Sequence, residues 1–149
     1  MSNHHASCVA IGPCGVLIRG ASGAGKSTLT LQLIDSQGYG LGKKLLRGQL
    51  VSDDQTLLLA MNGKLIGSPP KSLAGLIEIR GLGIITVAHK KSVNIKLVVD
   101  LLPPKIIERL PNPLDMHITL EGITLAHIAV ATGNPAAAAI VRSALQNML

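Results

Sequence analysis

The sequence Gly20-Ala21-Ser22-Gly23-Ala24-Gly25-Lys26-Ser27 gives the most direct indication of the fold. It fits, without a mismatch, the pattern of a glycine, any four residues and then Gly-Lys-Ser/Thr. Glycines let successive backbone N–H groups turn inward around phosphate oxygens, and a helix that begins near Lys26 directs its positive dipole end at the same anion. The pattern therefore predicts a site for a nucleoside triphosphate, with Lys26 at the β- and γ-phosphates and the Ser27 hydroxyl on magnesium.

The segments on either side of this loop support the same interpretation. A strand from Cys8, a turn over residues 12–15 and a second apolar strand, Val16–Ile18, precede the loop. Apolar residues at helical spacing predict a helix over residues 27–34 after it. Since the order strand, glycine-rich loop and helix is the expected context of the motif, we expect an α/β fold with a single P-loop kinase domain over residues 1–149.

The remaining elements are predicted from turn signals and periodicity. Asn62-Gly63 is the strongest short hairpin signal in the chain, and it predicts pairing of residues 56–61 with 64–67. Residues 36–48, rich in glycine, are expected to form a mobile surface loop. The other expected elements are strands at 50–52, 75–87 and 94–100, a hairpin of 117–120 with 123–128, a short helix at 105–110, and a helix from Asn134-Pro135 to about Asn147.

The composition narrows the class of protein. Of the 149 residues, 47% are hydrophobic and 15% charged, which suits a parallel sheet covered on both faces. With one Tyr and no Phe or Trp, the core must be aliphatic, and a stacking platform for nucleic acid is not expected. The net charge is +6, and basic groups such as Lys43, Lys44 and Arg47 are interpreted as solvated surface. The two cysteines are expected to be buried thiols. No secretory leader or long apolar run is recognised, so we expect a cytoplasmic protein without a membrane partner.

Two candidate acids could complete a nucleotide site. Leu97–Asp100 resembles an ordinary strand that ends in a metal-binding acid, whereas Leu50–Asp54 ends in the adjacent pair Asp53 and Asp54. Two neighbouring carboxylates can divide the work, one near the metal and the other free to accept a proton. A kinase needs both functions, so residue chemistry favours the pair, with Asp100 as the alternative.

Three stretches resemble the HPr kinase/phosphorylase family. They are His5 leading into Gly20–Ser27, then Val51-Ser52-Asp53-Asp54-Gln55, and then Glu78-Ile79-Arg80-Gly81-Leu82-Gly83-Ile84-Ile85, which is close to that family's own motif. The resemblance covers roughly residues 4–109. Longer members carry an N-terminal domain, so the chain resembles the short alphaproteobacterial form, which has the catalytic domain only. The resemblance implies a P-loop core related to phosphoenolpyruvate carboxykinase, commonly assembled as a hexamer.

The resemblance also implies roles for individual residues. The ATP site would be Gly20–Ser27, and the magnesium ligands would be Ser27 and Glu78. The remaining active-site residues would be His5, Lys26, Asp54 as the proton acceptor, Asp53 beside it, and Arg109. Glu78 and Arg80 lie two positions apart, so on a strand they share a face and could instead pair as ions. His89, His117 and His127 are not assigned to the site.

The implied activity is that of a magnesium- and ATP-dependent serine kinase acting on an HPr-type phosphocarrier protein of a phosphotransferase system. Longer members link an arginine-containing stretch near the C-terminus to the reverse phosphorylase reaction, whereas residues 129–135 here contain no arginine. Reverse activity is therefore not expected. Two other functions stay open from the residues alone: a small-molecule kinase of nucleoside or shikimate type, and a regulator that binds a nucleotide without transferring phosphate.

Overall fold

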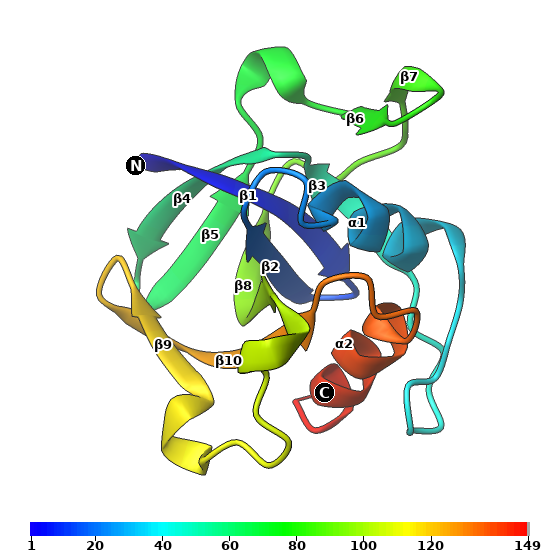
Figure 1. Ribbon diagram of the computed structural model, residues 1–149. Coiled ribbons are helices and arrows are strands. Elements are labelled where there is room, and N and C mark those ends of the chain that lie inside the picture. The colour runs from blue at the N-terminus through cyan, green and yellow to red at the C-terminus, as the bar shows by residue number, and fades with distance from the viewer. Residues whose placement is uncertain (149) are drawn as a thin grey trace.

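Ten strands and two α-helices follow one another along residues 1–148, the part of the chain that this computed structural model describes (Figure 1). Both α-helices lie on the same side of the main sheet, and β6 and β7 form a separate hairpin. The elements are β1 (Ser2–Ile11), β2 (Cys14–Gly20), α1 (Lys26–Asp35), β3 (Gly48–Ser52), β4 (Gln55–Met61), β5 (Lys64–Ser68), β6 (Leu76–Ile79), β7 (Gly83–Thr86), β8 (Val93–Leu102), β9 (His117–Leu120), β10 (Ile123–Ala131) and α2 (Ala137–Gln146).

The main sheet has eight strands, and five of them close into a ring. β2 pairs with β1, β1 with β4, β4 with β5, β5 with β8, and β8 again with β2. Only the pairings of β8 with β2 and β10 are parallel among the described strands. The expected parallel sheet is therefore wrong. The physical reason is that three tight hairpins, β1–β2, β4–β5 and β9–β10, place sequential strands side by side in opposite directions.

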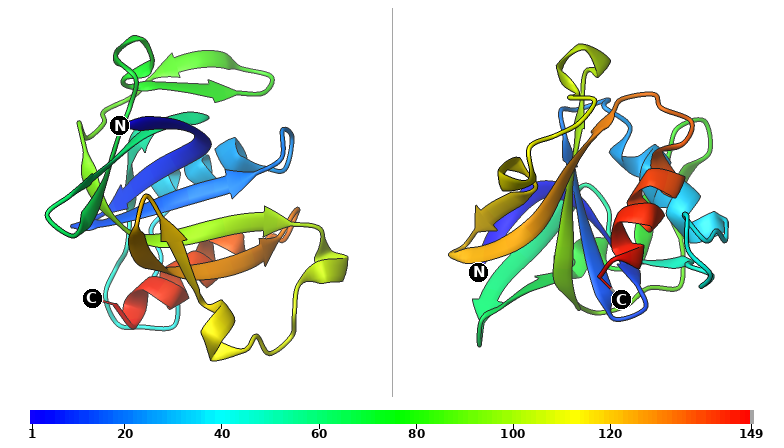
Figure 2. Two further views of the ribbon diagram at one scale, coloured as in Figure 1. Left: turned by 90° about the vertical axis from the view of Figure 1, so that its left-hand side faces the viewer. Right: turned by 90° about the horizontal axis from the view of Figure 1, so that it is seen from below.

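Two aliphatic cores lie on the two faces of the central strands. Because side chains alternate along a strand, Val16 and Ile18 of β2 pack toward α1 and α2, while Leu17 points into the ring. β8 changes its alternation where its register with β2 shifts between Ile95 and Leu97, so Ile95 faces the ring and Leu97 faces the helices. The helices thus cover one face, and the ring encloses the other (Figure 2).

The two cysteines are buried and free, as predicted. Cys8 points into the ring, where burial raises the pKa of its thiol. Cys14 lies in the core that α1 and α2 cover. Neither thiol belongs to the candidate functional site described below.

Several predicted elements differ from the structure. Residues 75–87 form the hairpin β6–β7 because Gly81 in the turn and Gly83 at the start of β7 adopt positive φ angles, of 87° and 100°. The short helix expected at 105–110 is only a 3₁₀ turn, Pro104–Ile106, in a segment with prolines at 103, 104, 111 and 113. α2 begins at Ala137, because Asn134 Oδ1 accepts from Ala136 N and caps the turn before the helix.

None of the helices within residues 1–148 is both long and apolar enough to span a membrane.

The helix-facing core predicts an asymmetry between two leucines of α1. Leu33 is 0% exposed and Leu31 is 36% exposed. Leu33→Ala should lower the free energy of unfolding by about 2–5 kcal/mol, because it removes packed methyl groups and leaves a cavity. Leu31→Ala, the matched control, should cost clearly less. Urea titration followed by far-UV circular dichroism measures both, and equal losses would mean that α1 is not packed as described.

Candidate functional site

The glycine-rich loop connects the end of β2 at Gly20 to the start of α1 at Lys26. Gly23 and Gly25 have φ angles of 80° and 103°, a left-handed conformation that glycine adopts without strain. Gly25 is the N-cap of α1, and no side chain caps the first N–H groups of the helix. These donors are therefore available to an anion at the positive end of the helix.

Lys26 lies back across this loop. Its side chain is largely buried, and Nζ donates to the carbonyl oxygens of Gly20 at 2.9 Å and Ala21 at 3.2 Å. These partners are neutral. A phosphate oxygen is a stronger acceptor for an ammonium group than a carbonyl oxygen, so the position of Lys26 suits transfer of its hydrogen bonds to a bound phosphate.

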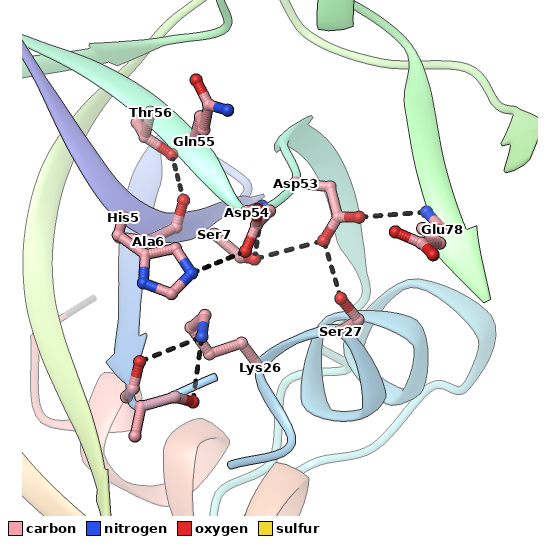
Figure 3. A network of polar contacts seen from close by, with 12 residues as sticks. His5, Ala6, Ser7, Lys26, Ser27, Asp53, Asp54, Gln55, Thr56 and Glu78 are labelled. Atoms are coloured by element: carbon pink, nitrogen blue, oxygen red, sulfur yellow. Dashed lines mark hydrogen bonds and ion pairs between the residues drawn. The ribbon is translucent and has the colours of Figure 1, made fainter. Parts of the chain in front are cut away.

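Asp53 is the carboxylate next to the glycine-rich loop (Figure 3). It lies just after β3 and is only 7% exposed. Its Oδ1 accepts from Ser27 Oγ at 3.0 Å and from Ser7 Oγ at 3.2 Å, and its Oδ2 accepts from the backbone N of Glu78 at 3.0 Å. The carboxylate therefore connects α1, β1 and β6.

Asp54 points away from its neighbour. Its φ of 66° is left-handed, which turns its side chain toward the solvent-facing side of the site. There Asp54 Oδ1 accepts from His5 Nε2 at 2.8 Å, and both side chains are about half exposed. The two adjacent acids thus have different environments: Asp53 is enclosed beside Ser27, and Asp54 is accessible beside His5.

Ser7 holds both acids in place and was not among the residues predicted from the sequence. Its hydroxyl is buried, donates to Asp53 and accepts from the backbone N of Asp54 at 3.0 Å. The only sequence signal for this role is a polar residue inside the otherwise apolar strand residues 6–11. Nothing in that signal identifies its partners, which are more than forty positions away along the chain.

Glu78 reaches the site and Arg109 does not. The Glu78 carboxylate lies on the same side of its strand as Asp53 (Figure 3), and within residues 1–148 no ion pair joins Glu78 to Arg80. Arg109 is exposed in the loop between β8 and β9. That loop extends from the lower side of the molecule in Figure 1 and in the left view of Figure 2, away from the β6–β7 hairpin. The structure therefore does not bring Arg109 to the other predicted residues.

Asp100, the alternative acid, belongs to a different network. Arg19 donates to it through two nitrogens, each at 2.8 Å, and His127 Nε2 donates at 2.7 Å. Burial by itself would raise the pKa of the Asp100 carboxyl, but the hydrogen bonds and charges of Arg19 and His127 outweigh it, so the pKa lies below its ordinary value. Asp53, and not Asp100, therefore lies beside Ser27.

The oxygen donors at this site suit a hard divalent cation. They are the Ser27 hydroxyl and the carboxylates of Asp53 and Glu78. Within residues 1–148 no group of three or more His, Cys, Asp or Glu residues is arranged to hold a metal ion. Mg²⁺ uses one or two carboxylates together with waters and substrate phosphates, and does not require a complete protein cage. The donor set therefore fits magnesium that arrives with a nucleotide.

The fold and the site define a mixed α/β protein in which a glycine-rich loop faces a split pair of acids. Residues 1–149 match the family model of the HPr serine kinase C-terminal domain, and the chain belongs to that family. A solved structure of the Hpr(Ser) kinase/phosphatase from Coxiella burnetii is similar over 99% of this chain and 96% of its own, with a TM-score of 0.79 and 30% identity.

Curated relatives show a more local similarity. An HPr kinase/phosphorylase from Clostridium beijerinckii is 41% identical over 83 residues, and one from Clostridium tetani is 42% identical over 83 residues. Each alignment covers 56% of this chain and 24% of the relative. The matched region is thus about a quarter of the length of these relatives.

The Asp100 network predicts a defined pH dependence of stability. The pKa of Asp100 is lower in the folded than in the unfolded chain. The carboxylate therefore stabilises the fold above its unfolded-state pKa of about 3.9, and this stabilisation is lost as the pH falls through the folded-state pKa. Asp100→Asn should destabilise the protein at pH 7 and flatten the fall in unfolding free energy below about pH 4. Denaturant titrations from about pH 2.5 to about pH 7 measure both effects. The exposed Asp35→Asn is the control, and an unchanged acid limb in Asp100→Asn would contradict the assignment.

Proposed function

We propose that this chain is a magnesium- and ATP-dependent serine kinase that acts on an HPr-type phosphocarrier protein of a phosphotransferase system in the cytoplasm. Membership of the HPr serine kinase C-terminal domain family and the similarity to the Coxiella burnetii protein support this activity. The observation that carries it is the division of the acid pair: Asp53 accepts from Ser27 at the start of α1, while Asp54 remains accessible beside His5.

The phosphates of ATP would bind where the glycine-rich loop meets α1. The uncapped N–H groups at the start of α1 and the ammonium group of Lys26 supply positive charge to the phosphate oxygens. Ser27, Asp53 and Glu78 would hold magnesium, which neutralises charge on the phosphates when it is bound. In this arrangement the loop acts as a P-loop, and Asp53 performs the task of the metal-side acid.

Asp54 would accept the proton of the attacking serine hydroxyl. The serine oxygen forms a bond to the γ-phosphorus, the bond from that phosphorus to the β-phosphate oxygen breaks, and ADP leaves. Asp54 is suited to this step because it is about half exposed and can reach an incoming side chain. His5, at 2.8 Å, orients the carboxylate and fixes which oxygen is free.

Arg109 would stabilise the transferred phosphoryl group only if it reached the site. This requires either that its loop moves or that the arginine comes from a neighbouring copy in the hexamer that the family resemblance implies. The reverse phosphorylase reaction is proposed to be weak, because residues 129–135 offer no guanidinium group to bind the attacking phosphate.

A single assay separates this function from the two alternatives. The chain is incubated with magnesium and ATP labelled at the γ-phosphate, together with a purified HPr-type protein, with nucleosides and shikimate, or with no acceptor. Label on a serine of the HPr-type protein, mapped by mass spectrometry, supports the proposal. Label only on a small molecule would identify a small-molecule kinase, and nucleotide binding without any transfer would identify a regulator.

Asp54→Asn should separate catalysis from nucleotide binding. ATP affinity should stay near that of the unchanged chain, because the loop and α1 provide those contacts. Serine phosphorylation should fall by a factor of about 10² or more, as expected for loss of a positioned base. Isothermal titration and a transfer assay measure the two quantities. If Asp54→Asn transfers phosphate at the normal rate while Asp53→Asn does not, the order of the pair is reversed.

Glu78→Gln should change the demand for magnesium. A neutral amide is a poorer ligand than a carboxylate for a hard cation, so the magnesium concentration at half-maximal rate should rise. Arg80→Gln is the matched control, because Arg80 lies in the same hairpin and its side chain has no oxygen atom that could bind the metal. A magnesium titration that is unchanged in Glu78→Gln would remove this residue from the metal site.

A further inference from the structure

The loop between α1 and β3, residues 36–47, has a defined structure, and the proposed chemistry does not use it. A backbone bridge between Gly38 and Leu46 closes it, with Leu46 N donating to Gly38 O at 2.8 Å. Leu46 is buried in the core that α1 and α2 cover. The loop follows the C-terminal end of α1, so it is separated from the glycine-rich loop by the length of that ten-residue helix, about 15 Å.

The expectation that this loop is mobile conflicts with how it packs on α2. The positions of the loop that lie against α2 are glycines: a Cβ at Gly38 would lie 2.7 Å from Arg142 Nη1, and one at Gly40 would lie 2.6 Å from Ser143 N. Gly42 lies equally tightly against Gln146. The Gln146 amide donates to the carbonyl oxygens of Tyr39 at 2.9 Å and Lys44 at 3.3 Å. The glycines thus let the loop lie flat on the helix.

Apart from Leu46, the large apolar side chains of the loop are exposed to solvent. Leu41 is 93% exposed, Leu45 50% and Tyr39, the only aromatic residue of the chain, 48%. The cations Lys43, Lys44 and Arg47 lie between and beside these apolar groups, and all three are exposed. Residues 36–48 contain no acid, and no ion pair with a carboxylate is formed by these three cations within the described chain.

We propose that this basic, apolar loop docks on the surface of an anionic lipid bilayer. The loop lies at the edge of the molecule (Figure 1), and its Leu41 is almost fully exposed. A bilayer accepts a projecting apolar side chain anywhere on its surface, whereas a protein partner would need a matching pocket. Flanking lysines and arginines attract anionic headgroups, and a tyrosine suits the boundary between headgroups and acyl chains.

A second copy of the chain is a poor occupant for the same surface. Two such loops placed face to face would bring together six cations and no acid, and like charges oppose association. Docking through the loop would leave the opposite end of α1, with its glycine-rich loop, directed away from the membrane. The inference therefore does not depend on the proposed kinase activity and is compatible with it.

The chain contains its own probe for this contact. Because Tyr39 is the single tyrosine and there is no tryptophan, intrinsic tyrosine fluorescence reports on this loop alone. The experiment mixes the full chain with vesicles of phosphatidylglycerol and phosphatidylcholine, and separately with vesicles of phosphatidylcholine only. Binding is measured by flotation, and access to Tyr39 by quenching with aqueous acrylamide and with lipids brominated near the headgroup.

The expected result is binding to the anionic vesicles only, weaker at high salt, with Tyr39 shielded from acrylamide and quenched by brominated lipid. Lys43→Gln with Lys44→Gln should weaken binding roughly 25-fold, since each cation near an anionic surface contributes about five-fold. Leu41→Ser should also weaken binding several-fold. The matched controls are Leu114→Ser, which changes a leucine that is 84% exposed elsewhere, and Lys64→Gln with Lys71→Gln; neither should alter binding.

Several outcomes would overturn the proposal. These are no binding to anionic vesicles at low salt, Tyr39 still open to acrylamide on bound protein, or equal losses in the control variants. If Leu41→Ser kept full binding, the chain would bind the vesicles through charge attraction alone, which would also contradict the proposal. Binding of soluble polyglutamate without vesicle binding would identify an acidic protein as the partner class, and concentration-dependent self-association lost in Leu41→Ser would identify a second copy.

Discussion

The buried carboxylate of Asp53 fixes the relative positions of the elements that form the candidate site. A carboxylate with little access to water must have its oxygens satisfied by donors within the protein. Here the donors come from the start of α1, from β1 and from β6, through Ser27, Ser7 and the backbone of Glu78. Moving any of these elements would leave a buried charge with fewer partners, which is costly. One carboxylate thus couples the glycine-rich loop to the two segments that carry His5 and Glu78.

This constraint also explains how two identical side chains in adjacent positions acquire different surroundings. The left-handed backbone at Asp54 turns its carboxylate away from Asp53, and the Ser7 hydroxyl accepts from the Asp54 backbone to hold that turn. One acid then remains enclosed beside Ser27, and the other remains open beside His5. Separate environments for paired acids are what a metal site and a proton acceptor require of the same short segment.

The sequence allowed part of this account to be predicted. The glycine-rich loop, the hairpin at Asn62-Gly63 and the pairing of residues 117–120 with 123–128 follow from local rules, because turns and loops need particular residue types. The closed ring of strands does not follow from such rules, since the pairings of β1 with β4 and of β5 with β8 join distant segments. Ser7 was missed for the same reason: its role is defined by acids far along the chain. The distance of Arg109 from the site is equally a property of the tertiary structure, which spacing alone cannot show.

The central claim is that Ser27 and Asp53 form the metal side of a phosphoryl-transfer site while Asp54 stays free for the acceptor serine. A crystal structure of the chain with magnesium and a non-hydrolysable ATP analogue tests this most directly. The account predicts phosphate oxygens against the first N–H groups of α1, Lys26 turned from its carbonyl partners onto the phosphates, and the metal on the side of Ser27 and Asp53, with Asp54 outside its coordination shell. A metal bound by Asp100, or by Asp54 in place of Asp53, would contradict it.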